Sequence, residues 1–183
     1  MKRALVLGGG GPVGIGWEAG LLVGLARSGV DVDRADAVVG TSAGSVVGFT
    51  LASGGDLTEA TALVGEARQT QDADPVAAGA SDELEQLIST IAEAAADPQA
   101  AESARAGLGA VALRSPTISE QRWLDMFGSF AGAEWPQGFA CTAVDTESGR
   151  FEVWRKSSGV DVQHAVASSC AVPAIFPPVT IKG

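Results

Sequence analysis

A serine flanked by two glycines is the feature of this sequence that points most directly to chemistry. Residues 40–44 read GTSAG and match G-x-S-x-G, the pattern that exposes a serine hydroxyl on a sharp turn between a strand and a helix. Gly40 and Gly44 leave room for that turn, and the start of the following helix adds positive potential near the Ser42 hydroxyl. This setting favours a nucleophile for acyl transfer at Ser42, whereas an isolated match would fit a serine that only caps a helix.

A second glycine-rich turn, at residues 8–14 with the sequence GGGGPVG, can supply the hydrogen-bond donors that such a nucleophile needs. The intermediate of acyl transfer carries a negative oxygen, and each donor aimed at that oxygen is usually worth roughly 3 to 4 kcal/mol. The first two strands of a βαβ unit end at the same edge of a parallel sheet, so this turn and Ser42 can face each other there. Glycine backbone also approaches a substrate closely, because it carries no side chain.

The same turn matches G-x-G-x-x-G through Gly9, Gly11 and Gly14, which is the fingerprint of a dinucleotide site. A dinucleotide site also needs an acidic residue near the carboxyl end of the second strand, where it holds the ribose. Asp36 stands at the beginning of the second predicted strand instead. A nucleotide-binding βαβ protein is therefore kept as an alternative to acyl transfer.

Hydrophobic patterning predicts the βαβ unit that positions these turns. Short apolar runs at residues 3–7 and 36–39 are typical of parallel strands, and we expect the first strand to be buried on both faces. Apolar residues at helical spacing predict a helix over about 15–27, with residues 8–14 as a loop before it. The residues that define this helical pattern are Trp17, Leu21, Leu22 and Leu25.

The rest of the chain fits a single domain, residues 1–183, with a helical insertion at about 56–130. A helix that starts after Ser119 is expected to bury Trp123, Leu124 and Phe127. The other predicted elements are a buried helix over about 45–51, strands over 139–144 and 151–154, and a short helix over 162–168.

Residues 37–55 carry no charge and together reach the length of a membrane span. Serines, threonines and glycines inside this run lower its hydropathy far below that of a leucine-rich span. We therefore interpret the run as a buried strand, the turn at Ser42 and a buried helix.

Composition narrows the class of protein. The chain has 183 residues, 46% of them hydrophobic and 19% charged, and these values are typical of a globular protein. Its net charge of −10 argues against nucleic acid as a partner and against permanent binding to an anionic membrane. Cys141, Cys170 and the single His164 have no metal-ligand spacing, so we expect reduced core cysteines, no metal, no cofactor and a cytoplasmic location.

Four stretches of the sequence together resemble the patatin-like phospholipases, which are serine lipid acyl hydrolases. They are residues 7–14 (LGGGGPVG), residues 39–45 (VGTSAGS), residues 143–145 (AVD) followed by Ser148 and Gly149, and residues 165–179 (AVASSCAVPAIFPPV). The resemblance implies a three-layer α/β fold, a mostly parallel sheet with helices on both faces, and a Ser-Asp dyad. It also implies that Ser42 is the nucleophile and that the amides of Gly10 and Gly11 build the oxyanion hole.

The chain departs from the family pattern at two places. Val13 stands where the family often has arginine or lysine, and the family's catalytic aspartate belongs to a D-G-[GA] motif beyond the proline-rich stretch. We therefore expect that aspartate beyond Gly183, so that the fold is truncated before it and residues 1–183 alone are nearly inactive. Asp145, Asp161 and His164 are better explained by a turn, a helix cap and packing.

Taken with the resemblance, the sequence predicts a lipid acyl hydrolase of the phospholipase A or carboxylesterase type. Its expected partners are a lipid or ester substrate, a membrane or micelle in transient contact, and a complementary C-terminal fragment or chain. The alternative from a different class is a non-catalytic module that binds acyl chains or a partner on the same fold.

Overall fold

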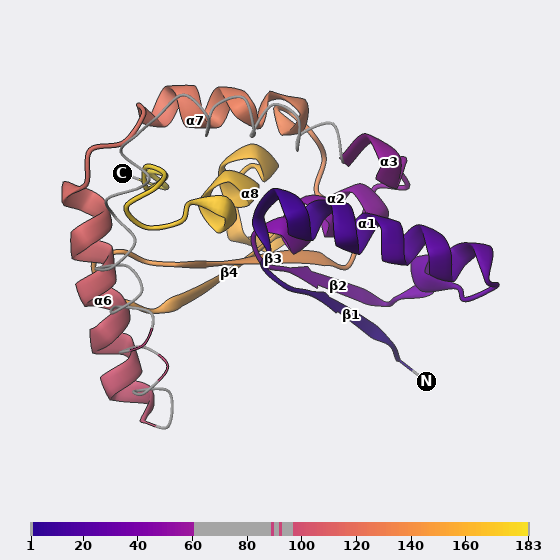
Figure 1. Cartoon of the computed structure of the whole chain (residues 1–183), viewed down its shortest axis with the longest axis horizontal. Coiled ribbons are helices and arrows are strands. Elements are labelled where there is room, and N and C mark those ends of the chain that lie inside the picture. Colours follow the sequence, from indigo (N-terminus) through magenta and orange to yellow (C-terminus); the bar gives the residue numbers. More distant parts are fainter. Residues whose placement is uncertain (1, 61–88, 90–91, 93–96, 183) are drawn as a thin grey trace.

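Four strands form the central sheet in the computed structural model, which describes residues 2–60, 89, 92 and 97–182 (Figure 1). Their order in the sheet follows their order in the chain. The strands are β1 (Ala4–Leu7), β2 (Ala37–Gly40), β3 (Phe139–Val144) and β4 (Phe151–Arg155). The first three strands are parallel and β4 is antiparallel to β3, so the predicted α/β fold with a mostly parallel sheet is confirmed.

Six α-helices are described in these residues. They are α1 (Gly11–Arg27), α2 (Ala43–Ala52), α3 (Leu57–Ala60), α6 (Pro98–Arg114), α7 (Glu120–Met126) and α8 (Val162–Cys170). The prediction of a loop that extends to Gly14 is wrong, because α1 already begins at Gly11. Pro12 fits the first turn of a helix, where the missing N–H would have no partner in any case.

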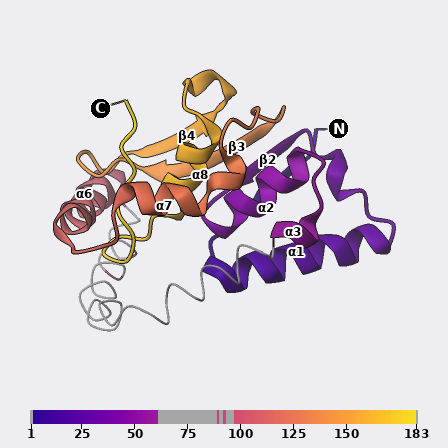
Figure 2. The ribbon, with the colours of Figure 1, turned by 90° about the horizontal axis from the view of Figure 1, so that it is seen from above.

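Helices α1, α2, α3, α7 and α8 lie on one side of the sheet, whereas α6 stands at the end of β3 and β4 and extends past the sheet (Figures 1 and 2). Helix α2 packs on β1, β2 and β3, and α8 packs on β3. Helix α1 then packs on α2 and α3, while α7 packs on α8. These helices thus form the expected helical layer on one face, and α2 is the helix that connects this layer to the centre of the sheet.

Side chains that alternate along the strands show the difference between the two faces of the sheet. Leu7, Val38 and Cys141 point into the helical layer and are buried. Val6 and Phe151 belong to the other face, where 73% and 66% of their surface is exposed. The prediction that the first strand is buried on both faces is therefore wrong, because Val6 of β1 is exposed on the face opposite Leu7.

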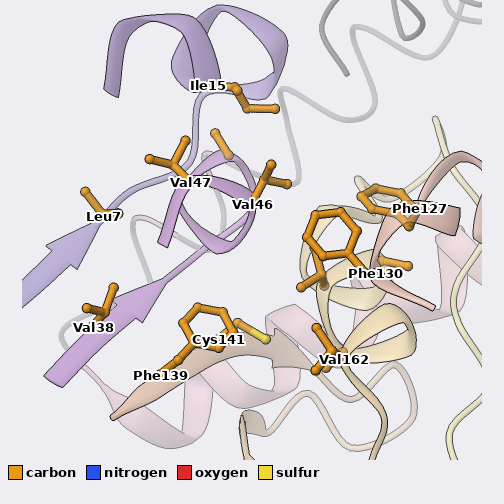
Figure 3. Packing of buried hydrophobic residues seen from close by; sticks show 14 of the residues in the cluster. Leu7, Ile15, Val38, Val46, Val47, Phe127, Phe130, Phe139, Cys141 and Val162 are labelled. Atoms are coloured by element: carbon orange, nitrogen blue, oxygen red, sulfur yellow. The ribbon is translucent and has the colours of Figure 1, made fainter. Parts of the chain in front are cut away.

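The core lies between the sheet and the helices. Figure 3 shows Val46 and Val47 of α2 between Ile15 of α1 and the sheet residues Leu7 and Val38. Val46 and Val47 are at most 1% exposed. This packing fixes the start of α2, and with it Ser42, relative to the carboxyl ends of the strands.

Helices α3, α6 and α7 fall within residues 56–130, where the sequence predicts a helical insertion. Helix α7 follows Ser119, whose hydroxyl accepts the Arg122 N–H, and Trp123, Leu124 and Phe127 are buried as predicted. Helix α6 begins after its cap Asp97 and contacts the turn between β3 and β4. The other residues of the predicted insertion, 61–88, 90–91 and 93–96, lie outside the described ranges, and the single-domain assignment stays a prediction.

Residues 37–55 adopt the strand, turn and helix that their polar content predicts. Among the described helices, none combines the length and the hydropathy that a membrane span requires.

Candidate active site

Ser42 occupies a strained turn between β2 and α2. Its φ is 52° and its ψ is −116°, a backbone conformation that residues other than glycine seldom adopt. Strain of this kind costs on the order of 1–3 kcal/mol and persists only where the surrounding structure imposes it, often at functional sites. The turn therefore has the sharp geometry that the G-x-S-x-G pattern predicts.

Gly40 and Gly44 make this turn sterically feasible. A Cβ atom at Gly40 would collide with the backbone of Gly44 and Ser45 in α2, and a Cβ atom at Gly44 would collide with Leu7 in β1. The strand and the helix therefore approach each other across backbone atoms alone. This close approach is what leaves Ser42 at the carboxyl edge of the sheet.

The Ser42 hydroxyl is not used to cap helix α2. Ser42 stands at the N-cap position, yet its side chain makes no capping hydrogen bond. Its backbone is held by other groups, because the Ser42 N–H donates to the Ser169 hydroxyl at 2.9 Å and the Ser45 hydroxyl donates to the Ser42 carbonyl at 2.6 Å. A serine that served only as a helix cap would instead accept a backbone N–H of the first helical turn through its side-chain oxygen.

The Cys170 thiol lies beside the Ser42 turn, 3.7 Å from the Ser45 hydroxyl. Burial raises the pKa of this thiol to about 12, so it stays protonated at neutral pH. Cys170 can therefore act neither as a thiolate nucleophile nor as a base for Ser42. Both Cys170 and the buried Cys141 are free thiols.

The glycine loop, residues 8–11, lies against the Ser42 turn. A Cβ atom at Gly9 would be 3.7 Å from the Cβ of Ser42. Two backbone hydrogen bonds fasten the loop, one from the Thr41 N–H to the Leu7 carbonyl at 3.1 Å and one from the Gly44 N–H to the Gly8 carbonyl at 2.9 Å. The arrangement agrees with the expectation that both turns meet at one sheet edge, because Leu7 and Gly40 are paired at the ends of β1 and β2.

Three backbone amides of this loop carry no acceptor. Among the described residues, no oxygen accepts a hydrogen bond from the N–H of Gly9, Gly10 or Gly11, and all three glycines are exposed. They precede or open α1, so the positive end of that helix lies at the same place. Free donors and a positive potential next to a serine hydroxyl suit a negative oxygen that develops there.

The other acidic and basic residues considered from the sequence have structural contacts. Asp145 accepts the N–H and hydroxyl of Ser148 at 2.7 and 2.6 Å, which lowers the pKa of its carboxyl. Asp161 caps α8 and pairs with His164 at 2.8 Å. Asp36 accepts the Arg3 N–H at 2.7 Å at the start of β2, away from the glycine loop, so it offers no ribose contact there.

Sequence reasoning missed two residues that contact this site, Ser169 and Glu18. Ser169 lies in one of the stretches that carry the family resemblance, but its bond to the Ser42 N–H joins residues far apart in the chain and has no local pattern. Glu18 accepts the Gly8 N–H. In the sequence, Glu18 stands out only as a single acidic residue between apolar positions of a predicted helix.

Comparisons with known proteins relate the sequence to one family. A family model described as patatin-like phospholipase matches residues 5–183. A search of curated protein sequences found no match.

Two crystal structures of the type III effector protein ExoU are similar to this chain. The first has a TM-score of 0.49 and 21% identity, over 94% of this chain and 40% of ExoU. The second, full-length ExoU in complex with full-length SpcU from Pseudomonas aeruginosa, has a TM-score of 0.46 and 19% identity, over 100% of this chain and 41% of its counterpart. The chain thus spans about two fifths of these proteins.

Proposed function

The chain belongs to the patatin-like phospholipase family, and from that membership we propose that it is a serine-dependent lipid acyl hydrolase with Ser42 as its nucleophile. The proposed reaction is ester hydrolysis of the phospholipase A or carboxylesterase type. The observation that carries it is the strained Ser42, whose φ is 52° and whose hydroxyl is left uncapped beside the free glycine amides.

In the proposed reaction the Ser42 Oγ attacks the carbonyl carbon of a lipid ester, and the serine proton passes to a base. The carbonyl oxygen becomes an oxyanion, which the N–H groups of Gly10 and Gly11 stabilise. Collapse of this intermediate breaks the ester C–O bond and releases the alcohol, which takes up a proton. Water then hydrolyses the acyl-Ser42 ester, so that the fatty acid leaves and the hydroxyl is restored.

We propose that the base is an aspartate of a D-G-[GA] motif beyond Gly183, as the family pattern implies. Within the described residues, no carboxylate or imidazole makes a hydrogen bond to the Ser42 hydroxyl, and the bonds of Ser42 are those of its backbone. Asp145 and Asp161 are engaged in a turn and a helix cap, which supports a base from elsewhere.

We also propose that α1 meets the lipid surface from which the substrate comes. Val13, Trp17 and Leu21 follow one another at intervals of four, so they share one side of the helix. They are 75%, 66% and 45% exposed. The charged residues of α1 are the buried Glu18 and Arg27 in its last turn, so this side offers a lipid aggregate an uncharged apolar stripe.

Hydrolysis of a soluble p-nitrophenyl ester tests the function by comparing three proteins. They are residues 1–183, the same residues with their downstream segment, and that longer protein with the aspartate of its D-G-[GA] motif changed to asparagine. We expect turnover mainly from the second protein, because loss of the base in serine hydrolases costs roughly 10⁴-fold. Full activity from residues 1–183 would place the base within them, and no activity from any of the three would favour a non-catalytic acyl-binding module.

A further inference from the structure

Glu18 is the one charged side chain that is buried in the described part of the chain. It lies on the inward side of α1 with Ile15, Ala19 and Leu22, and only 6% of its surface is exposed. An acidic residue at such a position is expensive to bury unless its oxygens find partners. Its partners therefore indicate why the site tolerates it.

One carboxylate oxygen of Glu18 has a single backbone partner and the other has none. Oε1 accepts the Gly8 N–H at 2.9 Å. Oε2 is buried and has no hydrogen-bond partner among the described residues. Burial raises the pKa of this carboxyl, an effect that the bond from Gly8 partly opposes. A side chain that only filled space here would be apolar, so the bond to Gly8 is the specific contact that an acid provides.

That contact completes the fastening of the glycine loop. The carbonyl of Leu7 accepts the Thr41 N–H, and the carbonyl of Gly8 accepts the Gly44 N–H, so both oxygens are tied to the Ser42 turn. The Gly8 N–H between them is tied to Glu18. At the end of the loop that leads into α1, the Gly14 N–H donates to the Gly10 carbonyl at 2.8 Å and anchors the loop to the helix.

We propose that Glu18 is a positioning residue that aims the oxyanion donors. Two turns into α1, it reaches back to Gly8 and closes the short loop whose free amides belong to Gly9, Gly10 and Gly11. With Gly8 fixed from both the Ser42 turn and α1, those amides hold one direction relative to the Ser42 hydroxyl. This inference rests on the proposed function for its catalytic consequence, and on the contacts alone for the fixing of the loop.

Three variants separate positioning from packing. Glu18→Met keeps the length of the side chain and removes the acceptor. Glu18→Gln keeps an oxygen that can accept the Gly8 N–H without the charge. Glu134→Gln, at an exposed position, is the matched control for the change of carboxylate to amide. If Glu18→Met does not fold, Glu18→Asp takes its place, because its carboxyl is one methylene too short for the same bond.

Amide hydrogen exchange of the peptide covering residues 7–14 is the first measurement, since it needs no enzymatic activity. We expect faster exchange in Glu18→Met than in the parent, and a return toward the parent rate in Glu18→Gln. Equal exchange in all the proteins would overturn the inference, because the loop would then be fixed without Glu18.

The second measurement is kcat and KM for a soluble p-nitrophenyl ester, with the downstream segment present. Misaimed donors should lower kcat by about 10- to 100-fold in Glu18→Met with little change in KM, since catalysis depends steeply on donor placement. Glu18→Gln should recover most of that loss. Equal losses in both Glu18 variants would contradict positioning by an acceptor. If the parent hydrolyses no ester, the proposed function fails while the exchange result still decides the role of Glu18.

Discussion

Two residues of the candidate site hold positive φ angles, Ser42 at 52° and Gly11 at 55°. Ser42 must adopt this angle despite its side chain, which stores strain at the proposed nucleophile. Gly11 adopts it without strain, because glycine has no Cβ. The chain can therefore enter α1 through a conformation that glycine adopts freely, and this requirement falls on a single residue.

Gly11→Ala tests that requirement. No atom lies within 4 Å of the added methyl group, so the cost is conformational and should destabilise the fold by about 1–2 kcal/mol. Relief of that strain by rotation would also misaim the donor, and we expect ester turnover to fall by at least about tenfold. Urea unfolding and kcat report the two effects.

Gly16→Ala is the matched control, because Gly16 lies inside α1 with equally open space but without a positive φ. It should stabilise the protein by about 0.5–1 kcal/mol and leave turnover unchanged. If both variants behave alike, the φ of Gly11 has no role in the site.

Three consecutive side chains at the end of helix α8 connect this helix to β4 and to the Ser42 turn. Ser168 accepts the indole N–H of Trp154 at 3.1 Å, Ser169 accepts the Ser42 N–H at 2.9 Å, and Cys170 contacts Ser45 at 3.7 Å. One helix end therefore fastens both β4 and the proposed nucleophile. Of these contacts, the Ser169 bond alone holds the strained residue itself.

Ser169→Ala should let Ser42 relax from its strained conformation. Loss of one hydrogen bond is worth about 0.5–1.5 kcal/mol, so we expect kcat to fall by roughly two- to tenfold as Ser42 leaves its strained geometry. Ser168→Ala removes the bonds of the neighbouring hydroxyl to the Trp154 indole and the Ala165 carbonyl, and it should reduce stability without that loss of kcat. A larger kcat effect from Ser168→Ala than from Ser169→Ala would show that the turn does not depend on Ser169.

Local patterning predicted the elements well where a glycine, a proline or a change of period marks their ends. Strand β3 occupies the predicted residues, and α1 ends at Arg27 before Ser28 as predicted. The start of α1 was missed because glycines at 8–14 are typical of a loop, and the packing that makes Gly11 helical is not local. Trp17 and Leu21 fit an apolar helix pattern but are exposed, because the pattern cannot tell which of two apolar sides faces the core.

The sequence predicted the motifs of the candidate site, but it did not predict the hydrogen bonds that hold those motifs in place. The sequence pointed to Ser42 and to the glycine turn because strand ends in a βαβ unit share an edge. The contacts of Ser169 and Glu18 join residues that only the tertiary structure brings together. The roles of Ser42, Gly10 and Gly11 remain predictions until activity is measured.

For the whole molecule, charge and apolar surface set different limits on its partners. The net charge of −10 disfavours anionic surfaces, whereas the stripe of Val13, Trp17 and Leu21 on α1 favours uncharged apolar ones. Transient contact with zwitterionic or neutral lipid aggregates is consistent with both. The cytoplasmic location remains a prediction.

Trp17→Ser tests the proposed contact of α1 with a lipid aggregate. We expect the parent to bind zwitterionic phosphatidylcholine vesicles with a blue shift of tryptophan fluorescence, and anionic vesicles more weakly. The substitution should weaken vesicle binding by about tenfold, which corresponds to roughly 1.4 kcal/mol of lost apolar burial. Leu113→Ser on α6, where 58% of the side chain is exposed, is the control and should leave binding unchanged. Sedimentation with vesicles measures both variants, and equal losses would refute a specific role for α1.

The most direct test of the account is to identify the serine that reacts with a fluorophosphonate probe. The protein, with its downstream segment, is treated with the probe, digested and mapped by mass spectrometry, with Ser42→Ala as the paired variant. The strained turn and the free glycine amides predict a single phosphonylated residue, Ser42, and no labelling or ester hydrolysis in Ser42→Ala. A label on another serine, or full esterase activity in Ser42→Ala, would contradict the assignment of Ser42 as the nucleophile.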